Sequence, residues 1–491
     1  MMQKFEFPIH SGLTGCLKER IIRSWQRLHQ SDYQVENVFK KADCAWPGDY
    51  EGRLLLALSK LMRTDKLTSP TVEAMKQCYK KYCNAQGYLG PVHEDFIDEQ
   101  QLAGHGWVLR SLSEMQLLQP SELWCELADS MVNGFKKLLT GKVGTYPVSD
   151  GERKNCGAVD GSADKRIGNW QVSTDVGAVF IFFDGLVQTA EVFRLDCREL
   201  IDEFYALAQK LDVLAVKAQT HATLTLCRGL LRYAEYSSKQ AAEDLAVKLY
   251  ELYKARGMTL NYANYNWFDR PEWTEPCAIV DSFIVTMELF RRTGNAEYLD
   301  DAHRIWFSGV ERSQRQSGGF GGENCLTHSE QELYMKFYEA PNCCNMRGAE
   351  GLYECAMKSI YRNNIDNVLL VALPVPGIFT FADGLTVEIR TNYPDGGAWQ
   401  CKVLAPGKNP PKQIKVYRVN EQWRDTDDPQ EYAPQKMPLN SCQAYTLWQG
   451  PVMLGKDQYG VLHKLNNFYQ LDRSQAEKLH LQCIFSNQPF Q

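Results

Sequence analysis

The chain has 491 residues, of which 44% are hydrophobic and 23% are charged, and its formal net charge is −6. This length exceeds the roughly 250–300 residues at which one hydrophobic core stops growing, so we expect two domains unless a large helical barrel takes up most of the chain. The net charge is mildly negative, and positive and negative residues are interspersed along the chain, which argues against nucleic acid as a partner.

The first residues show neither an apolar core nor a small-residue cleavage site, and no later stretch approaches the roughly 18 uninterrupted apolar residues of a membrane span. We therefore expect a cytoplasmic protein without a membrane partner. The chain contains 16 cysteines. In a long chain of this kind we expect them to be reduced, buried or bound to metal rather than paired in a disulfide framework.

Helical periodicity dominates from about residue 12 to residue 362, where apolar residues recur at i, i+3, i+4 and i+7 between short Gly, Pro, Asn or Asp turns. The short connections predict antiparallel neighbouring helices, so the region is expected to form stacked helical hairpins that close into an (α/α)6 barrel over residues 1–364. The clearest segments are 102–118, 176–193, 200–214, 221–236, 241–253, 278–292, 296–309 and 349–361.

The pattern changes after Asn364, where apolar and polar residues alternate with the period of half-buried strands. We expect a C-terminal β-sandwich domain over residues 365–491. Residues 420–438 are polar and predict a long loop, and residues after about 466 show no clear period. The predicted strands are 368–374, 379–381, 385–391, 399–403, 414–419 and 444–448.

Two short clusters carry the chemistry: Glu275-Pro-Cys277 and the adjacent pair Cys343-Cys344. Three thiols and one carboxylate can close a tetrahedral zinc site, with zinc at about 2.3 Å from sulfur and about 2.0–2.2 Å from oxygen. Both clusters stand at the start of helical patterns, where the helix dipole favours the thiolate needed for ligation and for attack. Spacing alone leaves a catalytic zinc site, a structural zinc site and coincidence open.

The same residues resemble glycoside hydrolase family 127, the β-L-arabinofuranosidase family. The segment Thr274-Glu-Pro-Cys-Ala278 resembles the Glu-Thr-Cys-Ala motif of that family, and Cys343-Cys-Asn-Met346 resembles its Cys-Cys-Pro-Pro motif. The resemblance covers roughly residues 40–455 and implies a helical barrel followed by a β-sandwich. It implies a retaining glycosidase in which Cys343 is the nucleophile, while Glu275, Cys277 and Cys344 complete a zinc site with it.

One departure from the family concerns the proton donor. The family carries a Gly-Glu-x-Phe motif ahead of its Glu-x-Cys, and its Glu is the general acid/base, whereas residues 258–266 of this chain contain no carboxylate. Asp269 and Glu272, which follow in the same loop, are candidates for the missing group. Glu323, in the Gly-rich segment 318–323, is another.

Two histidines and the ligand carboxylate are expected to contact the substrate. His105 and His221 follow small residues at predicted helix starts, and the resemblance implies that they bind sugar hydroxyls. Without the resemblance, each would be read as a helix-end or core histidine. Glu275 is also expected to accept a hydrogen bond from the sugar.

Aromatic residues gather just ahead of the predicted zinc ligands, and Tyr265 and Trp267 are the ones we assign to substrate binding. Sugars present apolar C–H faces that stack on aromatic rings, although such residues also fill barrel cores. Asp175 and residues 169–171 are weaker candidates for the same face.

The sequence therefore predicts a zinc-dependent retaining glycoside hydrolase with a cysteine nucleophile, acting on a small furanoside or oligosaccharide. A carbohydrate-binding paralogue with little turnover is an alternative, because the usual acid/base is missing. A sugar epimerase or isomerase is another, because α/α barrels with paired histidines also support proton transfer at sugar carbons. The predicted partner is a small carbohydrate, with a homodimer as a further possibility.

Overall fold

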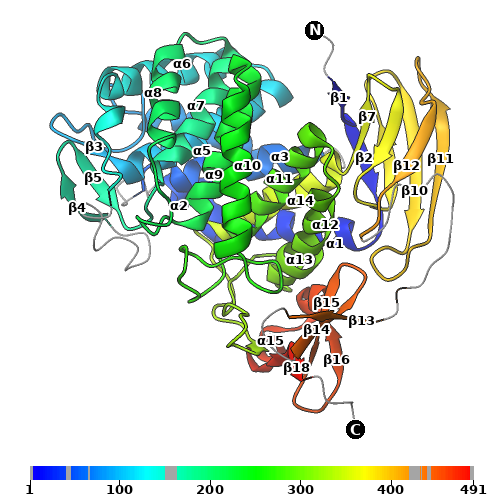
Figure 1. The fold of residues 1–491 in the computed structure, drawn as a ribbon. Coiled ribbons are helices and arrows are strands. Elements are labelled where there is room, and N and C mark those ends of the chain that lie inside the picture. The colour runs from blue at the N-terminus through cyan, green and yellow to red at the C-terminus, as the bar shows by residue number, and fades with distance from the viewer. Residues whose placement is uncertain are drawn as a thin grey trace.

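The computed structural model describes residues 4–39, 46–64, 67–149, 163–419, 432, 434–439 and 444–486. A helical barrel forms the bulk of the molecule, and two separate β units lie against one side of it (Figure 1). No helix in these described ranges is long and apolar enough to cross a membrane.

Six inner helices form a closed ring in the described chain. Each contacts the next in order, and the last contacts the first, which closes the ring. This arrangement confirms the predicted (α/α)6 barrel. The inner helices are α3 (Asp49–Met62), α5 (Glu99–Leu118), α7 (Val179–Phe193), α9 (Thr220–Ser237), α11 (Pro276–Thr293) and α14 (Cys344–Lys358).

An outer layer covers this ring, because each inner helix contacts a helix on its outer side. The outer helices are α4 (Pro70–Tyr82), α6 (Glu122–Leu139), α8 (Arg198–Ala208), α10 (Gln240–Arg256), α12 (Glu297–Arg304) and α1 (Gly15–Arg27). Shorter helical segments are α2 (Val35–Phe39), a π-helical turn (Ile305–Val310) that continues α12, and α13 (Glu311–Ser313).

Glycines allow the inner helices to pack closely. A Cβ atom on Gly185 of α7 would lie 2.3 Å from the carbonyl oxygen of Gly106 on α5, and one on Gly106 would lie 2.2 Å from the carbonyl oxygen of Ile181. Real Cβ atoms do not approach backbone this closely, so α5 and α7 need glycine at both positions. The inner helices are consequently buried on nearly every side.

The starts of the inner helices gather at one rim of the barrel. Strand β3 (Ile97–Asp98), just ahead of α5, pairs with β5 (Trp170–Ser173), which lies just ahead of α7 and also pairs with β4 (Ala163–Ile167). Gln219, immediately ahead of α9, contacts Glu275, immediately ahead of α11. Side chains at the starts of these four helices can therefore meet at this rim.

The β-sandwich consists of two four-stranded sheets in the described chain, and one edge strand of each sheet comes from the N-terminal segment. One sheet has the order β1 (Phe5–Glu6), β7 (Ile360–Asn363), β8 (Val368–Val371), β12 (Gln413–Val416). The other has the order β11 (Trp399–Pro406), β10 (Leu385–Thr391), β9 (Gly377–Thr380), β2 (His10–Leu13). The sandwich thus includes residues on both sides of the boundary that we predicted at residue 364.

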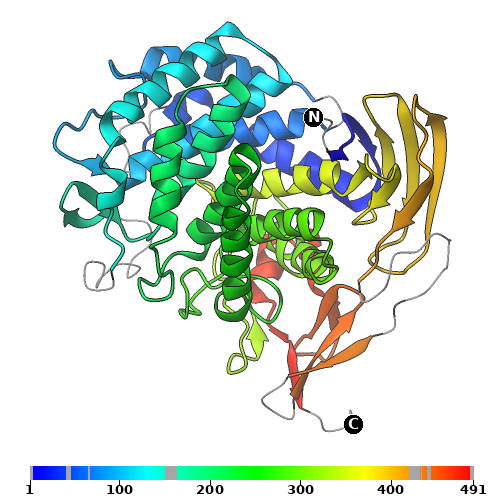
Figure 2. The same ribbon diagram turned by 45° about the horizontal axis from the view of Figure 1, so that its top comes forward.

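A second β unit follows the sandwich, so residues 365–491 do not form one sandwich as predicted. Its sheet has the order β13 (Gln435–Pro438), β14 (Ala444–Gln449), β15 (Val452–Lys456), β17 (Leu481–Gln482), β6 (Glu332–Leu333). Strand β16 (Leu462–Lys464) pairs with β15, and β18 (Ile484–Ser486) pairs with β14. Both views show this sheet apart from the sandwich (Figures 1 and 2).

The last part of the chain, which the sequence pattern left unassigned, also contains the 3-10 helix Leu465–Gln470 and helix α15 (Arg473–Lys478). The predicted loop 420–438 lies mostly outside the described residues, and its final four residues form β13.

Candidate metal centre

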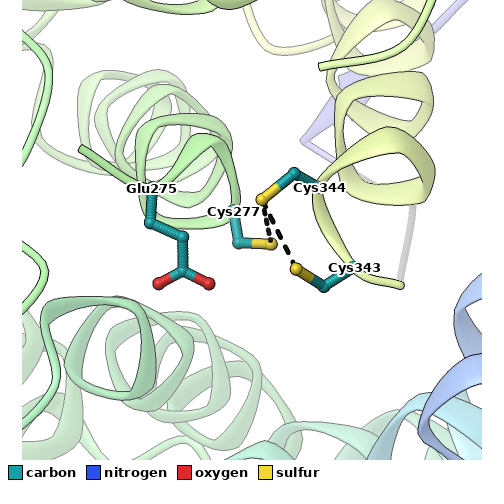
Figure 3. A group of neighbouring side chains, drawn as sticks. All are labelled: Glu275, Cys277, Cys343 and Cys344. Carbon is teal, nitrogen blue, oxygen red and sulfur yellow. Dashed lines mark hydrogen bonds between the residues drawn. The ribbon is translucent and has the colours of Figure 1, made fainter. Parts of the chain in front are cut away.

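The two predicted clusters meet at the barrel rim. Glu275 is the N-cap residue of α11 and Cys277 lies in its first turn, while Cys343 is the N-cap residue of α14 and Cys344 is its first residue. Because α11 and α14 are neighbours in the inner ring, their starts lie side by side. One donor atom from each of the four residues lies within 4.8 Å of the others, so the group could hold a metal ion (Figure 3).

The spacing of the sulfur atoms fits a tetrahedral thiolate site. The Sγ atoms of Cys277 and Cys344 are 3.7 Å apart, and those of Cys343 and Cys344 are 3.4 Å apart. Zinc bound at about 2.3 Å places two tetrahedral sulfur ligands about 3.8 Å apart. Soft thiolates with one carboxylate are also a donor set that zinc accepts.

Exposure divides the four residues into two pairs. Cys277 and Cys344 are buried, whereas Glu275 and Cys343 are partly exposed. Hydrogen bonds from the Cys277 and Cys344 thiols hold the pKa of Cys343 well below its ordinary value. Hydrogen bonding to Cys277 and Cys343 raises the pKa of Cys344, and burial raises that of Cys277. Cys343 is thus both the more accessible thiol of the cluster and the one whose pKa is lowered.

Neighbouring residues support the Glu275 carboxylate and its backbone. The Glu275 backbone N–H donates to Asn264 Oδ1 at 2.8 Å, and Gln219 Nε2 donates to Glu275 Oε2 at 3.4 Å. Burial raises the pKa of Glu275 well above its ordinary value, and the charges of Cys277 and Asp175 raise it further. Asp175, which had only weak support from the sequence, therefore acts electrostatically on the site.

Sequence reasoning missed Arg53, a residue of α3. Its Nη1 lies 3.6 Å from Cys277 Sγ, across a separation of 224 residues in the chain. No motif or spacing marks this residue in the sequence. Only the closure of the inner ring between α14 and α3 brings it to the cluster.

His105 does not take the predicted role. It lies within α5 rather than at its start, and it is fully buried. Its Nδ1 is 2.6 Å from the Gln101 carbonyl oxygen, and its Nε2 accepts the Leu89 backbone N–H at 2.9 Å. Both ring nitrogens are therefore used by the backbone, which corrects the assignment to sugar hydroxyls.

His221 is the second residue of α9 and is almost fully buried. Its Nδ1 lies 3.0 Å from Asp281 Oδ2, and its ring stacks on Trp107 at 5.8 Å. Burial lowers the pKa of His221 to about 3, so the ring is neutral near neutral pH. Trp107 also contacts Arg53, so the Trp107 ring lies between His221 and Arg53. The predicted contact of His221 with a sugar stays a prediction.

The two carboxylates assigned as proton donors are both held in ion pairs. Glu272 is 47% exposed and pairs with Arg270 at 2.6 Å. Glu323 is 3% exposed, and its carboxylate pairs with Arg312 at 2.9 Å, although its backbone hydrogen-bonds with Thr274, the residue before Glu275. These ion pairs oppose both assignments, which stay predictions. Asp269, the third candidate, forms an exposed pair with Arg256 at 2.7 Å.

The two aromatic candidates differ in their surroundings. Trp267 is fully buried, packs edge-to-face on Trp273 at 5.0 Å and lies under Arg270 at 4.5 Å. It is a core residue, which corrects its assignment as a pocket wall. Tyr265 is half-buried, and its backbone carbonyl accepts the Thr220 hydroxyl at 2.6 Å, so its role in binding stays a prediction.

No protein-family model and no curated protein matches this sequence. Several solved structures do match over nearly the whole chain. A family 127 β-arabinofuranosidase superposes with a TM-score of 0.66 at 12% identity, over 93% of this chain and 86% of its own. A structure described as a glycoside hydrolase gives 0.62 at 10% identity, over 93% and 84%. Ara127N-Se, a family 127 β-L-arabinofuranosidase from Geobacillus stearothermophilus T6, gives 0.60 at 12% identity, over 91% and 86%. The chain thus has the fold of the family 127 glycoside hydrolases.

Proposed function

We propose that the protein is a divergent relative of family 127 that acts as a zinc-dependent retaining glycoside hydrolase on a small furanoside or oligosaccharide, in the manner of a β-L-arabinofuranosidase. The observation that carries the proposal is the four-residue cluster at the barrel rim, in which Cys343 is accessible while Cys277 and Cys344 are buried. The likeness in fold to family 127 supports the same function.

Each of the four residues has a place in this chemistry. Bound zinc would keep the thiolates deprotonated and oriented, with Glu275, Cys277, Cys343 and Cys344 as ligands. The sulfur of Cys343 attacks the anomeric carbon, so that a C–S bond forms, the glycosidic C–O bond breaks and the departing oxygen takes up a proton from solvent. Water then attacks the same carbon, the C–S bond breaks, Cys343 returns as a thiolate and the proton of the attacking water passes to solvent. Two inversions at one carbon retain its configuration.

A carbohydrate-binding paralogue with little turnover is a second candidate function. It is favoured by the ion pairs that hold all three candidate proton donors, Asp269, Glu272 and Glu323. Loss of general acid catalysis slows such reactions by about 10²–10⁴-fold. This candidate keeps the zinc site and predicts sugar binding without a covalent step.

The two functions differ in whether Cys343 becomes labelled. Zinc content and intact mass would be measured after incubation with a cysteine-directed cyclophellitol-type furanoside probe. Wild type would be compared with Cys343→Ala, with Cys343→Ser, and with Cys16→Ala, which removes an exposed thiol outside the cluster. The hydrolase predicts one zinc per chain and a mass increase that both Cys343 variants lose and Cys16→Ala keeps. Zinc without labelling would support the binding paralogue, and no zinc would overturn both.

A cytoplasmic location and a homodimer stay predictions. The described cysteines form no disulfide with one another, as expected for thiols that are reduced or bound to metal. The expected partner is a small carbohydrate, because the related fold belongs to glycoside hydrolases.

A further inference from the structure

The proposed metal centre carries a charge that the surrounding protein must balance. Three thiolates and one carboxylate contribute four negative charges against the two positive charges of zinc, which leaves a net negative centre. Two of its four ligands are buried. Buried charge is costly unless it is paired and hydrogen-bonded, so a cationic donor is expected against the buried side.

Arg53 occupies that side. Its side chain is 6% exposed, and its Nη1 lies 3.6 Å from the sulfur of Cys277, one of the two buried ligands. The guanidinium group of arginine is not deprotonated in proteins. Arg53 is therefore a permanent cation next to the thiol cluster.

Two further contacts fix the guanidinium in place. Arg53 Nε donates to Asp49 Oδ1 at 2.8 Å, one turn earlier on the same helix. The guanidinium lies over the Trp107 ring at 4.3 Å from the ring centre. A planar group held by a carboxylate at one edge and an aromatic ring on its face has little freedom to turn away from Cys277.

We infer that Arg53 is a positioning residue of the metal centre, which hydrogen-bonds the Cys277 sulfur and supplies the positive charge that the buried ligands need. Asp49 and Trp107 hold it in the orientation for this contact. The inference rests on the proposed zinc site. Partners that hydrogen-bond metal ligands typically change metal affinity by about 10–100-fold when they are lost.

The geometry requires arginine rather than any cation. Two separate nitrogens contact Asp49 and Cys277, and the flat face of the group lies on Trp107. A lysine ammonium is a point charge without this fork or this face. Arg53→Lys should therefore keep the charge and lose the orientation, whereas Arg53→Met loses both.

The test measures metal binding in the full-length protein rather than turnover. Zinc affinity would be determined by competition with a chromophoric chelator, and the thiolate-to-cobalt charge-transfer band would be recorded after cobalt substitution. We expect Arg53→Met to bind zinc about 10–100-fold more weakly and to shift the cobalt band, with Arg53→Lys in between. Arg63→Met is the matched control, because Arg63 ends the same helix and pairs with Glu114 instead.

The outcomes separate this inference from the proposed function. A wild-type protein that binds no zinc would overturn both. Wild-type zinc affinity and an unchanged cobalt band in folded Arg53→Met would overturn the role of Arg53 alone. If Arg53→Met does not fold, as judged by circular dichroism, Arg53→Lys decides the matter, and an unshifted band in that variant would overturn the inference.

Discussion

The three cysteines of the cluster lie together at the barrel rim but differ in exposure and in pKa. Cys277, Cys343 and Cys344 are three thiols within one cluster, but only Cys343 combines access with a lowered pKa. Cys343, the N-cap residue of α14, is partly exposed, while Cys344, the next residue, is buried. Two adjacent cysteines thus differ in both exposure and pKa.

This division predicts the order in which the thiols react. In metal-free protein treated briefly with iodoacetamide, Cys343 should be alkylated before Cys277 and Cys344, because thiolate character and exposure control the rate. Peptide mapping by mass spectrometry would measure the three sites in one sample. Faster modification of Cys344 than of Cys343 would contradict the assignment of the nucleophile.

The ion pair with Arg312 indicates that Glu323 stabilises the fold, and we expect it to be dispensable for the chemistry. Glu323→Gln should lower the free energy of unfolding by about 3–5 kcal/mol, because it leaves the buried Arg312 without its charged partner. Chemical denaturation would measure the loss, and kcat of the folded variant should stay near that of wild type. Glu272→Gln, in an exposed pair, is the control and should change stability by less than about 1 kcal/mol. A large loss of kcat in folded Glu323→Gln would restore it as a catalytic candidate.

At the scale of elements, the inner helices owe their closeness to small residues. Helices α5 and α7 cross where Gly106 and Gly185 meet, and neither has room for a Cβ atom. This contact helps fix the spacing of the ring, and the ring in turn sets the distance between the starts of α11 and α14. The geometry of the cluster therefore depends on packing elsewhere in the barrel.

Gly185→Ala should consequently destabilise the barrel. The added methyl group would lie 2.3 Å from the Gly106 carbonyl oxygen, so the helices must shift apart. Overpacking of this kind costs about 1–3 kcal/mol. Thermal unfolding would measure it, with Gly144→Ala as the control, because a Cβ there would meet nothing within 4 Å. Equal melting temperatures of the two variants would show that the α5–α7 contact tolerates the shift.

Long helices were predictable because their periodicity extends over many residues, and the ring they form follows from short connections. The cluster of one carboxylate and three thiols was predictable because its residues occur as two short groups at helix starts. His105 and Trp267 were misassigned, and the ion pair of Glu323 was missed, because the sequence shows a residue type in a suggestive place but not its partners. Arg53 could not be predicted, because its role depends on a contact between α3 and α11, which lie 224 residues apart at Arg53 and Cys277.

At the scale of the whole molecule, the two ends of the barrel sequence meet in the sandwich. Strand β1 pairs with β7, and β2 pairs with β9, so each sheet of the sandwich takes one edge strand from the N-terminus. Strands β1 and β2 have only two and four residues, which is too short for the alternation of apolar and polar residues to be recognised. We therefore predicted them as part of the barrel, which we placed before residue 364. Helix α1 follows β1 and β2 in the chain and packs on α14, so the N-terminal segment joins both sandwich sheets to the barrel.

Deletion of residues 1–13 should therefore harm the sandwich, whose other strands lie more than 340 residues further along the chain. It removes β1 and β2, leaves α1 in place and exposes β7 and β9 as new sheet edges. Unpaired edges invite association with other chains, so we expect a lower melting temperature and concentration-dependent aggregation. Light scattering during thermal unfolding would measure both. Deletion of residues 1–4 keeps both strands and serves as the control, and equal behaviour of the two truncations would show that the sandwich does not depend on its N-terminal strands.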